Sequence, residues 1–198
     1  PVCSMSFWVL CTISSREERL EHFTALGVAV SSMCRDPLIE YGRRAFEDHK
    51  KGLCTYDVEQ VVLAIVVTTG IASIFLTKDY TPDYNSGLAH AVFYALTSCP
   101  VIEERHLHGE VVGFGVLLAL LADGQYEEFE KIYRLNRSIG LPVSLEEIEI
   151  TESQWQKCAE RIPDMSDVAH YPYRVTKEML EGAMEYLKEK VRKDSEED

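Results

Sequence analysis

Two histidines, His90 and His108, are the residues of this chain best suited to chemistry. They are 18 residues apart, and each lies near the start of a segment whose apolar residues recur at helical spacing, residues 87–97 and 106–115. Neutral imidazole is a frequent ligand of divalent metals, and a metal with an open coordination position can polarise a substrate oxygen. The pair therefore predicts one shared metal site, if the two helix starts lie side by side.

The chain between the two histidines is long enough to bring them together. The helix expected over residues 87–98 continues for ~10 Å beyond His90, and the connector over residues 98–107 can span ~30 Å when extended. The chain can therefore return to the level of His90, although the spacing does not require it. A catalytic zinc usually takes three protein ligands, so a carboxylate or a third histidine must come from elsewhere.

Five other polar residues are weaker candidates for such a site. His106 lies two residues before His108, a spacing that points it to another side, and Glu110 is better placed to favour the positive end of a helix dipole. His170 lies in a loop between two prolines and is expected to be exposed. His22 and His49 lie on polar helix faces and are expected to be solvated.

Composition restricts the class of protein. The 198 residues include 33 acidic and 20 basic ones, a net charge of -13, which argues against nucleic acid as a partner. Six cysteines without a C-x-x-C pair predict reduced, buried thiols and a cytoplasmic location. The apolar run over residues 61–76 is interrupted by polar residues and falls short of the ~20 residues that cross a bilayer. We therefore expect it to be a central buried helix, with no membrane partner.

The spacing of apolar residues predicts an all-α fold, a helical bundle. Hydroxyl and acidic caps predict one helix over residues 16–34, a second that begins at Asp36-Pro37, and a third capped by Asp57. The third helix covers residues 58–76, and later helices are expected over residues 87–98, 108–121, 126–139 and the stretch from about 175. No alternating strand and no G-x-G-x-x-G loop after a strand is found, so no dinucleotide fold is encoded. Gly109, Gly113 and Gly115 are spaced by four and two residues within an apolar helix. This spacing favours close packing of that helix against a neighbour over a phosphate-binding loop.

The residues around the two histidines also resemble a known family. The segments Ala89-His90-Ala91-Val92, 108–115 (HGEVVGFG) and 139–145 (IGLPVSL) are similar to the C-terminal helical domain of the glycerol dehydrogenase branch of the iron-containing alcohol dehydrogenase superfamily. The similarity spans roughly residues 36–190. Iron-binding members of the superfamily have a His-x-x-x-His motif at the first ligand position. In this sequence the fourth residue after His90 is Tyr94, which favours a resemblance to the glycerol dehydrogenase branch. The resemblance implies a dehydroquinate synthase-like helical domain.

The resemblance implies a chemistry as well. Members of the family oxidise alcohols or polyols, or reduce the matching carbonyls, with NAD or NADP, and a divalent metal holds the substrate oxygen. By motif match, His90 and His108 correspond to two metal ligands. Zinc is the metal of this branch, and iron is the alternative. The implied substrate is a small alcohol, polyol or hydroxy acid, and the implied assembly is a homo-oligomer or a complex with a partner chain.

Two departures from the family pattern shape the expected function. Family members carry an N-terminal nucleotide-binding domain that this sequence does not show, and their third ligand, an aspartate, would match residues 4–8, which contain no carboxylate. We therefore expect the metal-binding helical half of an NAD(P)-dependent oxidoreductase, inactive as an isolated chain, with NAD(P) bound only if a nucleotide-binding partner is supplied. The alternative is a non-catalytic interaction module or truncated gene product that self-associates through an exposed former domain interface.

These arguments also divide the chain. We expect a leading segment over residues 1–15 that matches the family poorly, a single helical metal-binding domain over residues 16–190, and a frayed charged tail over residues 191–198.

Overall fold

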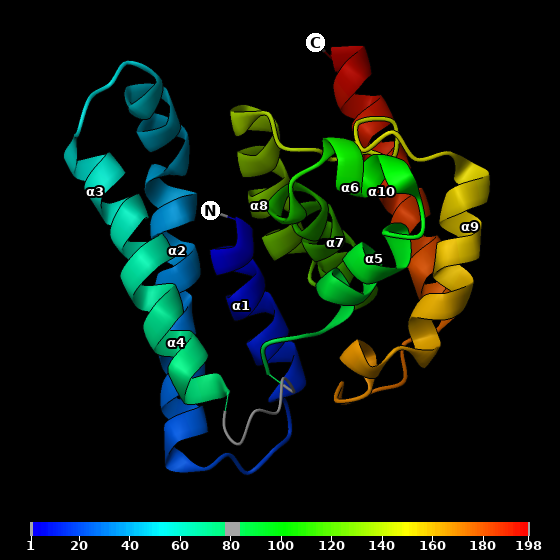
Figure 1. The fold of residues 1–198 in the computed structure, drawn as a ribbon, viewed down its shortest axis with the longest axis horizontal. Coiled ribbons are helices and arrows are strands. Elements are labelled where there is room, and N and C mark those ends of the chain that lie inside the picture. The colour runs from blue at the N-terminus through cyan, green and yellow to red at the C-terminus, as the bar shows by residue number, and fades with distance from the viewer. Residues whose placement is uncertain (1, 78–83, 198) are drawn as a thin grey trace.

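The computed structural model describes residues 2–77 and 84–197, and all regular structure within them is helical. The all-α bundle predicted from the sequence is thus confirmed (Figure 1). The α-helices are α1 (Val2–Ser14), α2 (His22–Lys50), α3 (Tyr56–Leu63), α4 (Thr69–Leu76), α5 (Leu88–Leu96), α6 (Pro100–Arg105), α7 (His108–Ala122), α8 (Tyr126–Ile139), α9 (Glu152–Arg161) and α10 (Lys177–Glu197). A π-helical turn (Ala64–Thr68) joins α3 to α4, and two 3-10 turns (Ile162–Asp164 and Ser166–Val168) follow α9.

Helix α7 is the centre of the core. Every residue from Val111 to Leu120 is completely buried or nearly so, and Leu121 is buried as well. A helix that is apolar on all sides must be covered on all sides, and α1, α5, α8 and α10 pack around it. Helix α2 and the α3–α4 stretch form an antiparallel pair on the outer side of α1 (Figure 1).

Helices α5 and α7 cross at very close range. A β-carbon built on Gly115 would lie 2.5 Å from the carbonyl oxygen of Ala89 and 2.9 Å from its α-carbon. Real side chains do not approach a backbone so closely, so only glycine permits this crossing. The prediction that Gly115 serves close helix packing is confirmed, and the residue it touches is the neighbour of His90.

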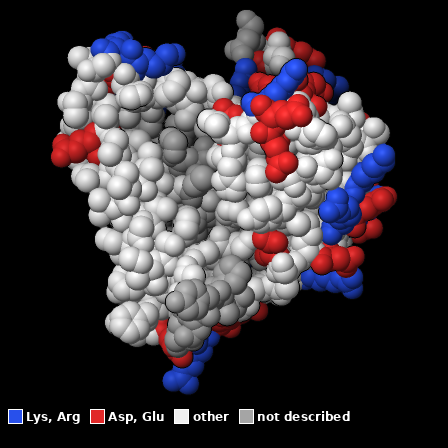
Figure 2. Space-filling view, in the orientation of Figure 1, with Lys and Arg blue, Asp and Glu red and all other residues white. Residues whose placement is uncertain are grey.

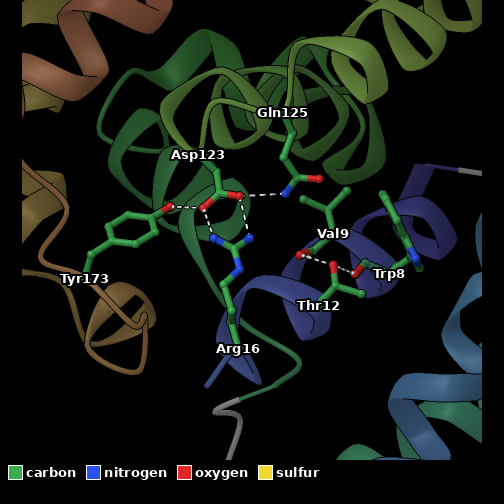
Figure 3. Close-up of polar contacts among 7 residues, drawn as sticks. All are labelled: Trp8, Val9, Thr12, Arg16, Asp123, Gln125 and Tyr173. Atoms are coloured by element: carbon green, nitrogen blue, oxygen red, sulfur yellow. Dashed lines mark hydrogen bonds and ion pairs between the residues drawn. The ribbon is translucent and has the colours of Figure 1, made fainter. Parts of the chain in front are cut away.

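A buried carboxylate ties the amino-terminal helix to the rest of the bundle (Figure 3). Asp123, at the end of α7, has only 2% of its side chain exposed. It accepts two hydrogen bonds from Arg16, at 3.0 and 2.6 Å, one from the hydroxyl of Tyr173 at 2.7 Å and one from the amide of Gln125 at 2.7 Å. Such charge-assisted bonds satisfy a carboxylate that burial would otherwise destabilise.

The first predicted helices differ from the observed ones. Residues 15–21 form a turn and a loop, in which Glu17 has a φ of 66°, and α2 then runs without a break through Pro37. The two predicted helices are therefore one. A proline removes one backbone hydrogen bond of a helix, but Pro37 is buried, and Arg35 beside it pairs with Glu128 and lies 4.6 Å over the ring of Trp8. These tertiary contacts outweigh the local preference of proline for a helix start.

The prediction that Asp57 caps the third helix is also wrong. Thr55 occupies the N-cap position of α3 and accepts a hydrogen bond from the backbone N–H of Val58 at 3.5 Å.

The stretch Tyr56–Leu76 is helical for 21 residues and is long and apolar enough to cross a membrane by length and composition alone. The prediction that this stretch is too short to cross a membrane therefore does not hold. The prediction of a central buried helix is wrong as well, because much of its outward side is exposed, with Val66 at 66% and Ile74 at 76%.

The last helix is longer than the sequence suggested. The tail over residues 191–198 was expected to fray, whereas α10 continues to Glu197. Asp194 explains the difference, because it pairs with Lys190 at 3.0 Å on its own helix and with Arg137 on α8, also at 3.0 Å. Burial raises the pKa of the Asp194 carboxyl, but the hydrogen bonds that Lys190 and Arg137 donate to it hold that pKa below its ordinary value.

The crossing of α5 and α7 predicts a large effect for one methyl group. We expect Gly115→Ala to lower the free energy of unfolding by about 3 kcal/mol, the upper part of the range for overpacked cores, because the obstacle is backbone. Urea denaturation followed by circular dichroism measures it. Gly182→Ala in α10 is the matched control: its β-carbon would meet nothing within 4 Å, so stability should stay equal or rise by up to ~1 kcal/mol. Equal effects at the two positions would contradict the packing argument.

The Asp123 cluster predicts a loss of stability in alkali. Burial, and then the hydrogen bond to Asp123, raise the pKa of Tyr173 above the ordinary value of 10.0. Above pH 10 the unfolded chain therefore releases a proton that the folded protein keeps, so stability must fall as pH rises. We expect Tyr173→Phe to cost about 1 kcal/mol at neutral pH but to lose less stability than the parent between about pH 9 and about pH 11. Tyr126→Phe, at an exposed tyrosine, should follow the parent at every pH.

Candidate functional site

His90 and His108 lie next to each other at the crossing of α5 and α7. His90 is in the first turn of α5, one residue after the Ala89 backbone that touches Gly115, and His108 is the first residue of α7. Their ring centroids are 5.7 Å apart and the ring planes are inclined by 37°. The structure therefore brings together the two residues that the sequence singled out.

The surroundings of His90 keep its imidazole neutral. Burial lowers its pKa, the neighbouring His108 lowers it further, and Asp167 acts in the opposite direction. The Nδ1 atom of His90 is buried and has no hydrogen-bond partner among the described residues. A buried nitrogen without a partner is costly, and a metal ion is one group that would satisfy such an atom. His90 and His108 thus fit two of the ligands of a metal centre.

Aromatic side chains frame the pair. The ring of Phe93 meets His108 edge-on with centroids 4.4 Å apart, and Tyr94 lies 6.4 Å from His90. His108 and Tyr94 are exposed, whereas His90 is only partly accessible. The site therefore has one buried imidazole and one that faces solvent, so a small molecule can reach it from outside.

No third ligand among the described residues completes the shell. Within residues 2–77 and 84–197, no three His, Cys, Asp or Glu side chains lie close enough together to hold one metal ion. In the region expected to match the family aspartate, Ser4, Met5 and Ser6 are buried in α1. One carboxylate acts electrostatically on His90, that of Asp167, which accepts a hydrogen bond from Ser86 just before α5.

Sequence reasoning missed Asp167. It lies in a short 3-10 turn far along the chain, and the packing of that turn on α5 brings it near His90. No spacing rule connects a residue of a loop to a helix that begins some 80 positions earlier. Its only sequence signal is its place in the proline-bounded loop that also contains His170.

The weaker candidates have other roles. The carboxylate of Glu110 accepts a hydrogen bond from the backbone N–H of Leu107 at 2.9 Å, so the prediction that it serves the start of α7 is confirmed. His106 lies 3.7 Å from Glu110 and 3.8 Å from Glu149. His170 is half-buried rather than exposed, because it pairs with Glu18 at 2.9 Å.

His22 and His49 are exposed, as predicted. His49 stands at the rim of an apolar cavity of about 220 Å³ between α2, α3 and α8. It is the only titratable side chain that lines this cavity.

Comparison with known proteins agrees with the resemblance in the sequence. No protein-family model matches the chain. Glycerol dehydrogenase of Pseudomonas putida is 32% identical over 170 residues, which cover 81% of this chain and 42% of that protein. Glycerol dehydrogenase of Thermotoga maritima is 31% identical over 161 residues, covering 77% of this chain and 40% of that protein. The chain is homologous to the C-terminal helical part of glycerol dehydrogenases.

Solved structures show the same fold. A probable glycerol dehydrogenase from Sinorhizobium meliloti 1021 superposes with a TM-score of 0.77 at 25% identity, over 96% of this chain and 54% of that one. Glycerol dehydrogenase from Schizosaccharomyces pombe gives a TM-score of 0.78 over 98% of this chain and 50% of that one; at 22% identity it supports the fold alone. The chain spans about half the length of these structures, and less than half of the curated relatives named above.

Proposed function

We propose that this chain is the metal-binding helical part of an NAD(P)-dependent oxidoreductase of the glycerol dehydrogenase type, acting on a small polyol, alcohol or hydroxy acid. The observation that carries the proposal is the convergence of His90 and His108, with ring centroids 5.7 Å apart, in a chain whose relatives are glycerol dehydrogenases. Zinc is the metal we favour, because neutral imidazoles are good zinc ligands, and iron is the alternative.

Each residue of the site has a physical task in this proposal. The bound metal would supply positive charge that polarises the hydroxyl or carbonyl oxygen of the substrate. Burial keeps His90 uncharged, which a metal ligand requires. The edge of Phe93 restricts the ring of His108, and the contact between Gly115 and Ala89 fixes how closely α5 approaches α7.

The lack of a carboxylate ligand among the described residues has an electrostatic consequence. Two neutral imidazoles leave the full charge of a divalent ion uncompensated, so we expect weaker binding than a site with an aspartate would give. Asp167 is placed to offset part of this charge from outside the shell. Ser86 and Ser166 both donate hydrogen bonds to its carboxylate, which keeps it oriented.

The nicotinamide cofactor would need a binding domain of another kind. The described residues contain no strand from which a dinucleotide fold could be built. We therefore propose that NAD(P) is held by a nucleotide-binding partner.

We also propose a cytoplasmic location, because Cys11, Cys34, Cys99 and Cys158 are buried free thiols and burial raises the pKa of Cys11 to about 12.

Metal binding tests the proposal directly. We expect the purified chain to bind zinc in isothermal titration calorimetry, and His90→Ala or His108→Ala to weaken binding by at least ~10-fold, since each removes one of two protein ligands. His49→Ala, which changes an exposed histidine at a distance from the pair, is the matched control and should bind like the parent. Equal binding by the parent and the double variant His90→Ala/His108→Ala would refute the site.

Catalysis by the chain alone is a separate test. We expect no reduction of NAD in the presence of glycerol and any divalent metal, because the described residues provide no nucleotide-binding fold. The absorbance of NADH at 340 nm, a standard property of the reduced nicotinamide, is the readout. Turnover above that of the His90→Ala variant would show that the chain binds its own hydride acceptor.

A further inference from the structure

The start of helix α5 is held by a hydroxyl group from a distant part of the chain. The backbone N–H of Leu88, the first residue of α5, donates a hydrogen bond to the phenolic oxygen of Tyr171 at 2.9 Å, and both residues are buried. The N–H groups of a first helical turn have no partner within the helix, and Gly87 at the N-cap has no side chain that could accept a hydrogen bond. Tyr171 therefore acts as the cap of α5.

The residue before α5 allows this hydroxyl to come close. A β-carbon built on Gly87 would lie 2.9 Å from the hydroxyl oxygen of Tyr171 and 2.8 Å from a methyl group of Leu10. A larger residue at position 87 would therefore push the phenol ring away from the helix start or displace Leu10. The glycine at the N-cap is thus matched to the tyrosine that takes the place of a capping side chain.

The segment that carries Tyr171 contacts the start of α5 at a second point. The 3-10 turn Ser166–Val168 packs on α5, and its Asp167 accepts a hydrogen bond from Ser86 just before that helix. The backbone N–H of Tyr171 donates a hydrogen bond to the carbonyl of Val168 at 3.3 Å. Asp167 and Tyr171 therefore belong to one folded segment, and together they hold the start of α5.

The position of His90 depends on how this first turn is held. His90 lies two residues after Leu88 in the same turn, and its backbone N–H donates a hydrogen bond to the carbonyl of Gly87 at 3.0 Å. If the turn frayed, the ring of His90 would move relative to that of His108, and metal affinity depends on the groups that orient the ligands. We propose that Tyr171 is a positioning residue of the histidine site, whose hydroxyl fixes the first turn of α5 so that His90 can share one metal ion with His108. This role rests on the proposed function, because it concerns the metal that the two histidines would bind.

The ring and the hydroxyl of Tyr171 have separate roles. The ring packs in the core, edge-on to the ring of Tyr173 with centroids 5.7 Å apart. The hydroxyl oxygen accepts the hydrogen bond at the start of α5. Tyr171→Phe therefore removes the cap and keeps the ring, so the metal affinity of this variant reports on positioning rather than on packing.

Zinc titrations of matched phenylalanine variants test this role. We expect Tyr171→Phe to raise the zinc dissociation constant about 10-fold, the lower end of the effects of groups that orient metal ligands. Tyr173→Phe is the control, because it removes a hydroxyl that bonds to Asp123 at the far end of α7; it should bind zinc like the parent. In a His90→Ala background, Tyr171→Phe should have no further effect, because the hydroxyl acts through His90.

The acidic surface decides the conditions of the titration. The chain has a net charge of -13, and Figure 2 shows acidic side chains grouped on its outer surface. Carboxylates also bind zinc, so a weak background is expected in every variant. Excess magnesium, which prefers oxygen ligands, occupies such carboxylates and leaves the imidazoles free for zinc.

Amide hydrogen exchange and a second variant make the test decisive. Residues 88–91 should exchange faster in Tyr171→Phe than in the parent, whereas the buried centre of α7 should exchange equally in both. If Tyr171→Phe does not fold, Gly87→Ala replaces it, since its methyl group would displace the hydroxyl and should weaken zinc binding in the same way.

The possible failures are distinguishable. Zinc binding by Tyr171→Phe equal to that of the parent, or an equal loss in Tyr173→Phe, would overturn the positioning role and leave the proposed function intact. A parent chain that binds no zinc would instead refute the metal site itself, and the positioning role with it.

Discussion

The contact between the backbones of α5 and α7 is the constraint on which the site depends. Gly115 has no side chain, so the Ala89 carbonyl at the start of α5 can lie against the middle of α7. Phe93, further along α5, then lies against His108 at the start of α7. Larger residues on either helix would separate the helices by the thickness of a methyl group or more. The distance between His90 and His108 is therefore a property of the packed core, since the crossing holds together the two helices to which these residues belong.

The core around this crossing explains why a chain with a net charge of -13 folds into one bundle. Helix α7 is covered on all sides, and acidic residues are confined to the outer surfaces of the helices around it. The one carboxylate found deep in the structure with several donors, that of Asp123, is held by Arg16, Tyr173 and Gln125. Its burial joins three separate parts of the chain without leaving a polar atom unsatisfied.

Much of this structure could be predicted from the sequence, because helical spacing and the segments around the histidines are local signals. The helices over residues 87–98, 108–121 and 126–139 lie close to where periodicity placed them. The break expected at Pro37 does not exist, since contacts made by Arg35 with Glu128 and Trp8 are not visible in a local pattern. The same limit applies to residues 61–76: composition shows that a helix is apolar, but only the packing of its neighbours decides which side is covered.

The link between Arg16 and its two distant partners has a consequence for biosynthesis. Arg16 follows α1 directly, whereas Asp123 and Tyr173 are made much later. During translation α1 can pack against α2 before α7 has emerged, whereas its α7-facing side stays uncovered until then. The network that anchors α1 is closed only when Tyr173 has left the ribosome. The α7-facing side of α1 is therefore exposed in the nascent chain until α7 follows, and chaperones that shield apolar segments have a binding site there during that interval.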